Sequence, residues 1–220
     1  MELLEGIETR KSIRAFKSTP IPEETIGRII KAASKSPSYT NTQPWEVAVV
    51  SGKKKEELSK ILYELAKSKV TPNPDLPRPQ TWPPELERRI KEHGARRFRT
   101  LGIERADEQQ RAELRLSNFE FYGAPYALFL FLDSTLSSWS IFDMGLFAQS
   151  IILAAHSFGV GSCIQATLAD YPDAVREFLG IPKTKRLVVG MSIGYPDLEA
   201  RLNAYQSLRV SPDDFVQWHS

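Results

Sequence analysis

Cationic and hydroxyl side chains gather near the start of this 220-residue chain. Arg10, Ser12 and Arg14 alternate along one pentapeptide, with Lys11 between the first two. A guanidinium group presents planar pairs of donors to phosphate oxygens, and a serine hydroxyl adds a short donor between them. The pentapeptide therefore predicts a grip for the phosphate of a nucleotide-like ligand.

A second polar stretch follows about thirty residues later, between prolines. It reads Pro37-Ser38-Tyr39-Thr40-Asn41-Thr42-Gln43-Pro44-Trp45. In a rigid loop of this kind, backbone and amide groups can face a flat heteroaromatic ligand. Neither stretch has glycines spaced as in a phosphate-cradling loop. Together the two stretches favour a bound nucleotide-like cofactor.

Other constellations are weaker. Cys163 and His156 could form a thiol nucleophile and its base, but no carboxylate orients the histidine, and a cysteine after a glycine turn is typical of packing. The three histidines and one cysteine lack metal-ligand spacing, so we expect no metal site. Gly159 and Gly161 lack a third glycine and a clear preceding strand, which excludes a dinucleotide-binding fingerprint.

The composition indicates a soluble globular protein, with 41% hydrophobic and 25% charged residues. Its length suits one well-filled core or at most two small domains. A net charge of +2 argues against nucleic acid or an anionic membrane as the partner. One cysteine excludes an internal disulfide and fits a reducing compartment. The N-terminus has no signal-peptide pattern, so we expect a cytoplasmic protein.

The segment 144–169 is uncharged and could be mistaken for a membrane span. Residues 144–169 contain no Asp, Glu, Lys or Arg. However, His156 and the glycines at 159 and 161 interrupt the apolar run, whereas a span needs about 20 predominantly apolar residues. We expect a buried core helix here, which could lie at a subunit interface.

Apolar periodicity predicts the remaining elements. Helices are expected at 1–9, 22–35, 53–68, 85–100, 107–122, from 138 onward, and at 172–179; strands are expected at 45–50, 126–132 and 186–195, with a short extended segment after Gly161. Helices interleaved with few, fully apolar strands indicate an α/β or α+β sheet between helices.

A proline-rich segment separates the first part of the chain from the two charged helices. Six prolines fall between Pro72 and Pro84, which rules out a helix there. We expect an ordered surface excursion with Leu76 and Trp82 as apolar anchors. In the C-terminal tail, Phe215 and Trp218 are the expected anchors.

The two polar stretches also carry a resemblance. Arg10-x-Ser12-x-Arg14, followed by Pro37-Ser38-x-x-Asn41-x-Gln43-Pro44-Trp45, resembles the nitroreductase family of FMN-dependent oxidoreductases. Gly123-Ala124-Pro125 and Gly194-Tyr195-Pro196 are similar to the family as well. The resemblance covers nearly the whole chain.

The resemblance implies a single FMN-binding domain over residues 1–220. Its fold would be α+β, a three-layer α/β/α sandwich with a mostly antiparallel central sheet. The family forms homodimers of domain-swapped type, with two active sites at the interface. The proline-rich and helical excursion at about 70–122 would then cover the active site.

The resemblance also implies roles for particular residues. The phosphate or ribityl chain of FMN would be held by Arg10, Lys11, Ser12, Ser207 and Arg209. Arg14 would lie by the pyrimidine edge of the flavin. The partner subunit would contribute Pro37, Ser38, Tyr39 and Asn41, whereas Ile164, Gln165 and Ala166 would lie along the ring, with a backbone N–H toward N5.

The implied reaction is a ping-pong hydride transfer. NADH or NADPH would reduce FMN and leave, and an electron-poor aromatic such as a nitroarene or quinone would take its place. No side chain need then act as acid, base or nucleophile. Phe119, Phe121 and Tyr122 would form a substrate wall, and the arginines of the 85–100 helix could favour the extra phosphate of NADPH.

Other readings stay open. Members of the same fold family remove halogens from aromatics, cleave flavin, or oxidise azoline rings in peptides. A flavin-free binding protein could also keep the fold. Nucleic-acid binding through the arginine-rich helix is disfavoured by its interleaved glutamates and by the near-neutral net charge.

Overall fold

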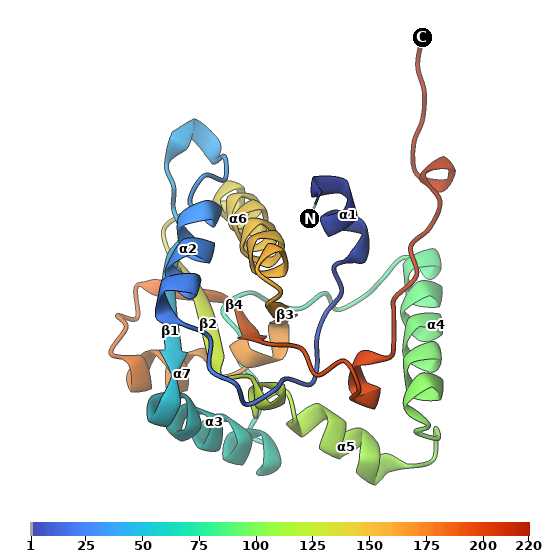
Figure 1. Cartoon of the computed structure of the whole chain (residues 1–220), viewed down its shortest axis with the longest axis horizontal. Helices are drawn as coiled ribbons and strands as arrows, with labels where there is room; N and C mark the ends of the chain where they lie inside the picture. The colour runs from blue at the N-terminus through green and yellow to red at the C-terminus, as the bar shows by residue number, and fades with distance from the viewer. Residues whose placement is uncertain (1) are drawn as a thin grey trace.

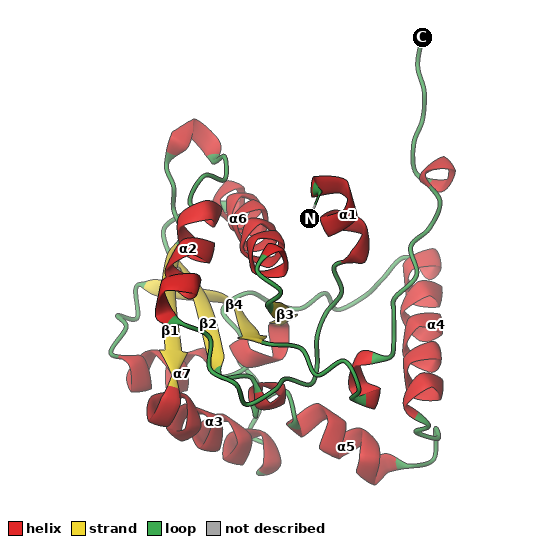
Figure 2. Ribbon diagram, in the orientation of Figure 1, coloured by secondary structure: helices red, strands yellow, loops and turns green. Residues whose placement is uncertain are grey.

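Four strands pair into one antiparallel sheet in the order β1-β2-β4-β3. The computed structural model describes residues 2–220. The strands are β1 (Glu46–Ser51), β2 (Tyr126–Asp133), β3 (Gly161–Gln165) and β4 (Lys185–Gly194). Figure 2 shows the sheet between helices, so the predicted α+β class with an antiparallel sheet is confirmed.

Helices cover both faces of the sheet and make three layers (Figure 1). One face packs against α2 (Glu23–Ala33) and α6 (Ser138–Ser157), the other against α3 (Gly52–Lys67) and α7 (Pro172–Leu179). Successive strand residues point to opposite faces. Leu128 and Leu130 therefore join the core under α6, whereas Phe129 joins the core under α3.

Helix α6 is the predicted core helix. Among residues 2–220 it alone is long and apolar enough by composition to cross a membrane. In this fold it lies along the sheet and α2, and Met144, Phe147 and Ile151 are buried in the core. Packing within the chain explains its buried side, whereas Trp139 and Phe142 near its start are exposed.

Three helices lie at the periphery: α1 (Leu3–Thr9), α4 (Pro84–Leu101) and α5 (Glu108–Leu116). The first expected helix thus begins at Leu3, and Met1 lies outside the described residues. The helix expected to run to Tyr122 ends at Leu116. Phe121 and Tyr122 both adopt φ of 54° in the turn before β2, a conformation that a helix cannot contain.

Polar contacts hold the proline-rich segment, in which Leu76, one of the two expected apolar anchors, is half-buried. Asp75 pairs with Arg176 of α7 and accepts from the Leu187 N–H at 2.8 Å. Arg78 pairs with Asp170. Trp82 is exposed. Prolines cannot donate backbone hydrogen bonds, so carboxylates and guanidinium groups fix the segment instead.

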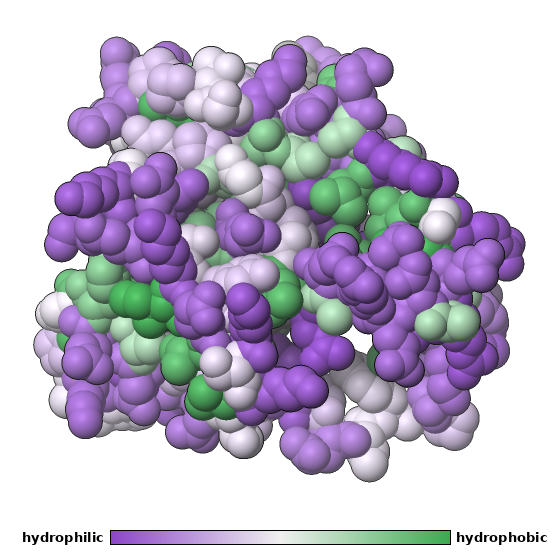
Figure 3. Space-filling view, turned by 90° about the horizontal axis from the view of Figure 1, so that it is seen from below, coloured by the Kyte–Doolittle hydropathy of each residue, from purple (hydrophilic) through white to green (hydrophobic). Residues whose placement is uncertain are grey.

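The C-terminal residues extend away from the body of the protein, as Figure 1 shows. Trp218 is 90% exposed, and Phe215 is exposed as well, so neither residue anchors the tail within its own chain. The face in Figure 3 is mainly hydrophilic, with its hydrophobic side chains in small patches. Phe215 and Trp218 are therefore apolar residues that their own chain leaves uncovered.

Candidate functional site

The N-terminal motif is fixed along the edge of the sheet. Ser12 forms a parallel bridge with Ser162 of β3, and the Ile13 N–H donates to the Ser162 carbonyl at 2.9 Å. A Cβ on Gly161 would lie 2.7 Å from Ile13 Cγ1. The missing side chain of Gly161 therefore lets the motif pack directly on the strand.

Asn203 ties this motif to the loop that precedes the tail. Its side chain accepts from the Arg14 N–H at 2.6 Å and donates to the carbonyls of Ala15 and Asp197 at 2.8 and 2.7 Å. The Lys11 ammonium donates to the Asn203 carbonyl at 2.7 Å. The Lys11 side chain therefore binds the backbone of this loop. The bridging role of Asn203 was not predicted from the sequence.

Four arginines converge beside the motif, from three separate parts of the chain: Arg10, Arg14, Arg97 and Arg209. Burial lowers the pKa of the Arg10 guanidinium, and the positive charge of Arg209 lowers it further. Burial likewise lowers the pKa of the Arg97 guanidinium, and the positive charge of Arg14 adds to this effect. Within residues 2–220, none of the four forms an ion pair with a carboxylate. Such an uncompensated cluster is an anion-binding environment.

Other arginines of α4 do have partners. Arg88 and Arg89 pair with Glu85, and Arg96 pairs with Glu92, all within the helix. Arg97 has no acidic residue three or four positions away, and its Nη2 atom is buried without an acceptor among the described residues. Sequence reasoning missed Arg97, although the missing helical partner is a signal that singles out Arg97 and Arg99.

The tail contributes less firmly to the cluster. Arg209 is exposed, and its Nη1 atom donates to the Ser207 hydroxyl at 2.8 Å and to the Ser207 carbonyl at 3.1 Å. The predicted pair Ser207 and Arg209 therefore lies together, with the guanidinium near Arg10.

Strand β3 leaves one edge of the sheet free beside Ser12. In a strand, the backbone groups of residues two positions apart point to the same side. The Ser162 carbonyl points to Ile13, so the N–H of Ile164 points to this edge as well. The side chains of Ile164 and Ala166 are exposed. Gln165 differs, since its buried amide donates to the Asn118 carbonyl at 3.0 Å and accepts from Ser192. Its side chain braces the turn before β2.

The second polar stretch lies elsewhere. The Tyr39 N–H donates to Asp143 Oδ1 at 3.1 Å, near the start of α6, whereas β3 follows the end of α6. A helix of 20 residues spans about 30 Å. One chain therefore does not bring Pro37, Ser38, Tyr39 and Asn41 to the arginines, and Figure 1 shows this separation.

The expected substrate wall is wrong for two of its three residues. Phe119 and Phe121 are 2% and 0% exposed and pack in the core with Leu58 and Leu62. They offer no surface to a ligand. Tyr122 is 8% exposed and lies beside Arg14 and Arg97, so it alone borders the cluster.

Two aromatic side chains that sequence reasoning did not single out, Trp139 and Phe142, lie exposed at the start of α6 beside Tyr39. Tyr39 stacks on Trp139 with ring centroids 5.8 Å apart and planes at 21°. Phe142 meets Trp139 edge-on at 6.3 Å. All three rings are more than half exposed. They form an exposed aromatic cluster that joins the 37–45 loop to α6.

Cys163 and His156 do not form a nucleophile pair. His156 Nε2 lies 2.9 Å from the Thr9 hydroxyl, on α1. Cys163 is buried, and burial raises the pKa of its thiol above the ordinary value despite the nearby Arg14. Among residues 2–220, no group of three or more His, Cys, Asp or Glu could hold a metal ion.

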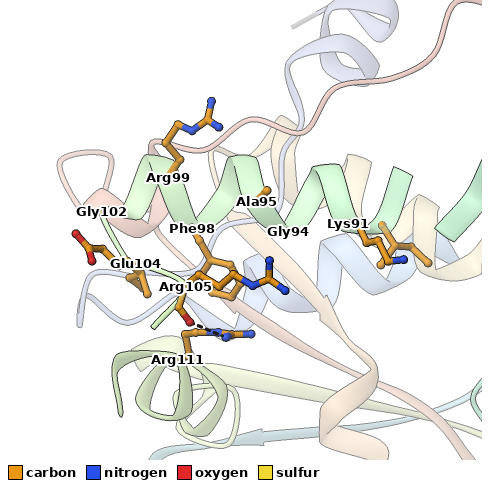
Figure 4. Close-up of a pocket in the computed structure, with 11 residues that line it drawn as sticks. Lys91, Gly94, Ala95, Phe98, Arg99, Gly102, Glu104, Arg105 and Arg111 are labelled. Atoms are coloured by element: carbon orange, nitrogen blue, oxygen red, sulfur yellow. Dashed lines mark hydrogen bonds between the residues drawn. The ribbon is translucent and has the colours of Figure 1, made fainter. Parts of the chain in front are cut away.

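A cavity of about 860 Å³ lies on the opposite face of α4. Figure 4 shows Phe98 pointing into it toward Arg111 of α5, whose guanidinium lies 5.1 Å from the centre of the Phe98 ring. None of the predicted site residues lines this cavity. It is therefore separate from the arginine cluster.

The chain is similar to known proteins over nearly its whole length. The Nitroreductase family model matches residues 7–195. A 4-nitrobenzoate reductase from Pseudomonas putida is 32% identical over 96% of this chain and 93% of its own. Nitroreductase NfnB from Mycolicibacterium smegmatis is 36% identical, over 93% of this chain and 87% of its own.

A solved structure is similar to this chain in both fold and sequence. The FMN-dependent nitroreductase NfnB from Mycobacterium smegmatis, in complex with NADPH, superposes with a TM-score of 0.94 at 32% identity, covering 99% of this chain and 97% of the other. The sheet, its helical layers and the edge motif thus define a flavoprotein-type α+β fold. The chain belongs to the nitroreductase family.

Proposed function

We propose that this protein is an FMN-dependent NAD(P)H oxidoreductase that reduces nitroaromatics, quinones or similar electron-poor aromatics by a ping-pong mechanism. The arginines beside the N-terminal motif carry the proposal: Arg10, Arg14 and Arg209. None of them pairs with a carboxylate within residues 2–220, and such guanidinium groups attract an anion. Family membership and the FMN named for two similar solved structures support FMN as that anion.

The chain's residues fit a flavin mononucleotide. Arg10, Ser12 and Arg209 supply convergent donors for its phosphate, and Arg14 supplies a cation for the pyrimidine edge. The free N–H of Ile164 offers a donor for N5 at the edge of β3. The other four predicted residues lie around these groups. Lys11 and Gln165 hold neighbouring backbone in place, Ser207 accepts a hydrogen bond from Arg209, and Ala166 is exposed next to β3.

When bound, FMN would supply the redox chemistry, taking a hydride from NAD(P)H and returning electrons to the aromatic acceptor. The chain's own part is to bind and to orient. Cations near the pyrimidine edge stabilise negative charge that develops there. Tyr122 and the packed turn at 118–122 restrict water on one side. No side chain acts as acid, base or nucleophile.

We also propose a homodimer that completes the site. The 37–45 loop lies about one α6 length from the arginines of its own chain, so Pro37, Ser38, Tyr39 and Asn41 would reach the flavin of the partner. Exposed apolar residues on α1, on α6 and in the tail offer the required interface: Leu3, Leu4, Trp139, Phe142, Phe215 and Trp218.

The remaining parts of the proposal concern organisation and location. Residues 1–220 form one domain, in which the excursion at 70–122 covers the active site through α4, since Arg97 and His93 lie at the cluster. A small aromatic is the substrate, and nucleic acid and membrane are not partners. The cytoplasm is the proposed location.

The test is the visible absorption of the purified protein. A yellow protein that bleaches with NADH or NADPH without oxygen, and recolours on addition of a nitroarene or quinone, supports the proposal. Parallel double-reciprocal plots would support the ping-pong order. A protein that stays colourless after reconstitution with FMN contradicts it. A yellow protein that bleaches but reduces neither acceptor would favour another chemistry of the fold, such as dehalogenation or azoline oxidation.

A further inference from the structure

We propose that Arg97 forms a second anion subsite, which binds the carboxylate of an aromatic acid substrate. The inference rests on the proposed function, because it assigns a substrate class to the same site. It also gives a role to a helix whose charges otherwise resemble a solvated surface.

The geometry of Arg97 differs from that of every ion-paired arginine on α4. Its Nη2 atom is buried and donates to no acceptor among the described residues. Arg88, Arg89 and Arg96 are satisfied by glutamates of their own helix. A buried guanidinium donor without a partner costs free energy, and an arriving oxyanion removes that cost.

The arginine cluster divides into two parts. Arg209 is the cation that acts on Arg10, at the start of the motif and beside the tail. Arg14 is the cation that acts on Arg97, beside Tyr122 and Cys163. Arg10, Ser12 and Arg209 already provide the donors for a phosphate. The Arg97 guanidinium comes from another element, α4, and is not needed for that grip.

The surroundings of Arg97 select the ligand class. A guanidinium fork matches the two oxygens of a carboxylate in one plane. Tyr122 and Cys163 flank the Arg97 guanidinium and are 8% and 2% exposed, so the fork lies against a packed wall that excludes water. A carboxylate attached to a flat ring fits both features. A neutral nitroarene would leave the Arg97 Nη2 atom without an acceptor.

The experiment uses the FMN-loaded protein and two variants, Arg97→Gln and Arg97→Lys. Arg99→Gln is the matched control, because Arg99 lies on the same helix, is exposed and forms no ion pair within residues 2–220. Benzoate is titrated while the visible flavin band is followed, which gives a dissociation constant without turnover. Steady-state constants are then compared for 4-nitrobenzoate and nitrobenzene.

The expected result is selective. Arg97→Gln should weaken benzoate binding, and should raise the Michaelis constant when 4-nitrobenzoate is the substrate, by roughly 10- to 100-fold, the value of a charge-assisted pair. Nitrobenzene kinetics should change less than about twofold. Arg97→Lys should lie between the wild type and Arg97→Gln, since it keeps the charge and loses the fork. Arg99→Gln should behave as the wild type.

Three outcomes would overturn the subsite. One is an equal loss for 4-nitrobenzoate and nitrobenzene. Another is a weaker FMN complex or a shifted flavin midpoint potential without discrimination between the two substrates, which would assign Arg97 to the flavin. The third is a wild-type protein that reduces nitrobenzene but does not bind benzoate. Failure of the proposed function has a different signature: a wild-type protein that holds no FMN.

Discussion

Asn203 shows how one buried amide can organise a site from a distance. It is 1% exposed and bridges the N-terminal motif and the 197–203 loop through three side-chain hydrogen bonds. Its side chain contacts backbone groups alone in these bonds, and through one of them it fixes the backbone of Arg14. Positioning residues of this kind carry no recognisable sequence motif.

Replacing Asn203 should therefore cost stability. Asn203→Ala leaves the Arg14 N–H and two carbonyls without partners in a buried place, so we expect a loss of about 2–4 kcal/mol in the free energy of unfolding. Urea denaturation measures it. Gln206→Ala, at an exposed neighbour, should change the value by less than about 0.5 kcal/mol. Equal effects of the two variants would contradict the bridging role.

His93 reports the electrostatics of the cluster. Burial, followed by Arg14, Arg97 and Arg209, lowers the pKa of its imidazole below the ordinary value. In the unfolded chain the imidazole has a pKa of about 6.5. The unfolded state therefore binds more protons at mildly acidic pH, and stability should fall as the pH falls below about 6.5.

The comparison of wild type with His93→Gln tests this effect. The difference in unfolding free energy between the two proteins should grow from about pH 7 to about pH 5, as measured by urea denaturation. Adding FMN should raise the pKa of His93 in an NMR titration, because a phosphate offsets the arginines. An imidazole with an ordinary pKa in the absence of FMN would contradict the repulsion.

At the scale of elements, α4 is the helix that gives the site its reach. One face carries Arg97 and His93 toward the cluster, and the other carries Phe98 into the cavity of Figure 4. The position of the helix end matters, because it fixes which side chains of α4 face the arginine cluster and which face the cavity. Gly102 ends it with φ of +65°, and a Cβ there would meet the Arg201 guanidinium at 2.3 Å.

Two glycines of α4 should respond in opposite ways. Gly102→Ala should destabilise the protein by about 1–2 kcal/mol, because its left-handed backbone disfavours a side chain and Arg201 must move. Gly94→Ala lies inside the helix with nothing within 4 Å of the new Cβ, and should stabilise it by about 0.5–1 kcal/mol. Thermal and urea unfolding check both. Effects of the same sign would contradict the assignment of the helix end.

The whole molecule has apolar surfaces that its own chain does not cover. They lie on α1, along the start of α6 and in the extended tail. In the proposed homodimer these surfaces pack against the partner, and the 37–45 loop of one subunit meets the arginines of the other. The site is then a property of two chains.

Removing residues 212–220 should weaken that assembly. The deleted segment holds Phe215 and Trp218, and burying two aromatic side chains against a partner supports a dissociation constant at least roughly tenfold tighter. Analytical ultracentrifugation over a dilution series measures it. Asp213→Ala serves as the control within the tail. A truncated protein with the dissociation constant of the full chain would show that the tail has no part in the interface.

The sequence by itself determined the elements whose signals are local. The strand at 126–132 lies within β2 (Tyr126–Asp133), and the helix at 172–179 has the bounds of α7, with a proline at its first position and Gly180 ending it in a left-handed conformation. Near-neighbour patterns suffice for such elements. The family motif at Arg10, Ser12 and Arg14 was equally legible, because its residue types and spacing are contiguous.

Only the tertiary structure decided which side chains meet. It buried Phe119 and Phe121 in the core, because the turn before β2 faces α3, and it ended α5 at Leu116. It brought Arg97 to Arg14 from a distant part of the chain and separated the 37–45 loop from both. Convergence of this kind depends on the packing of distant segments, which no local pattern contains.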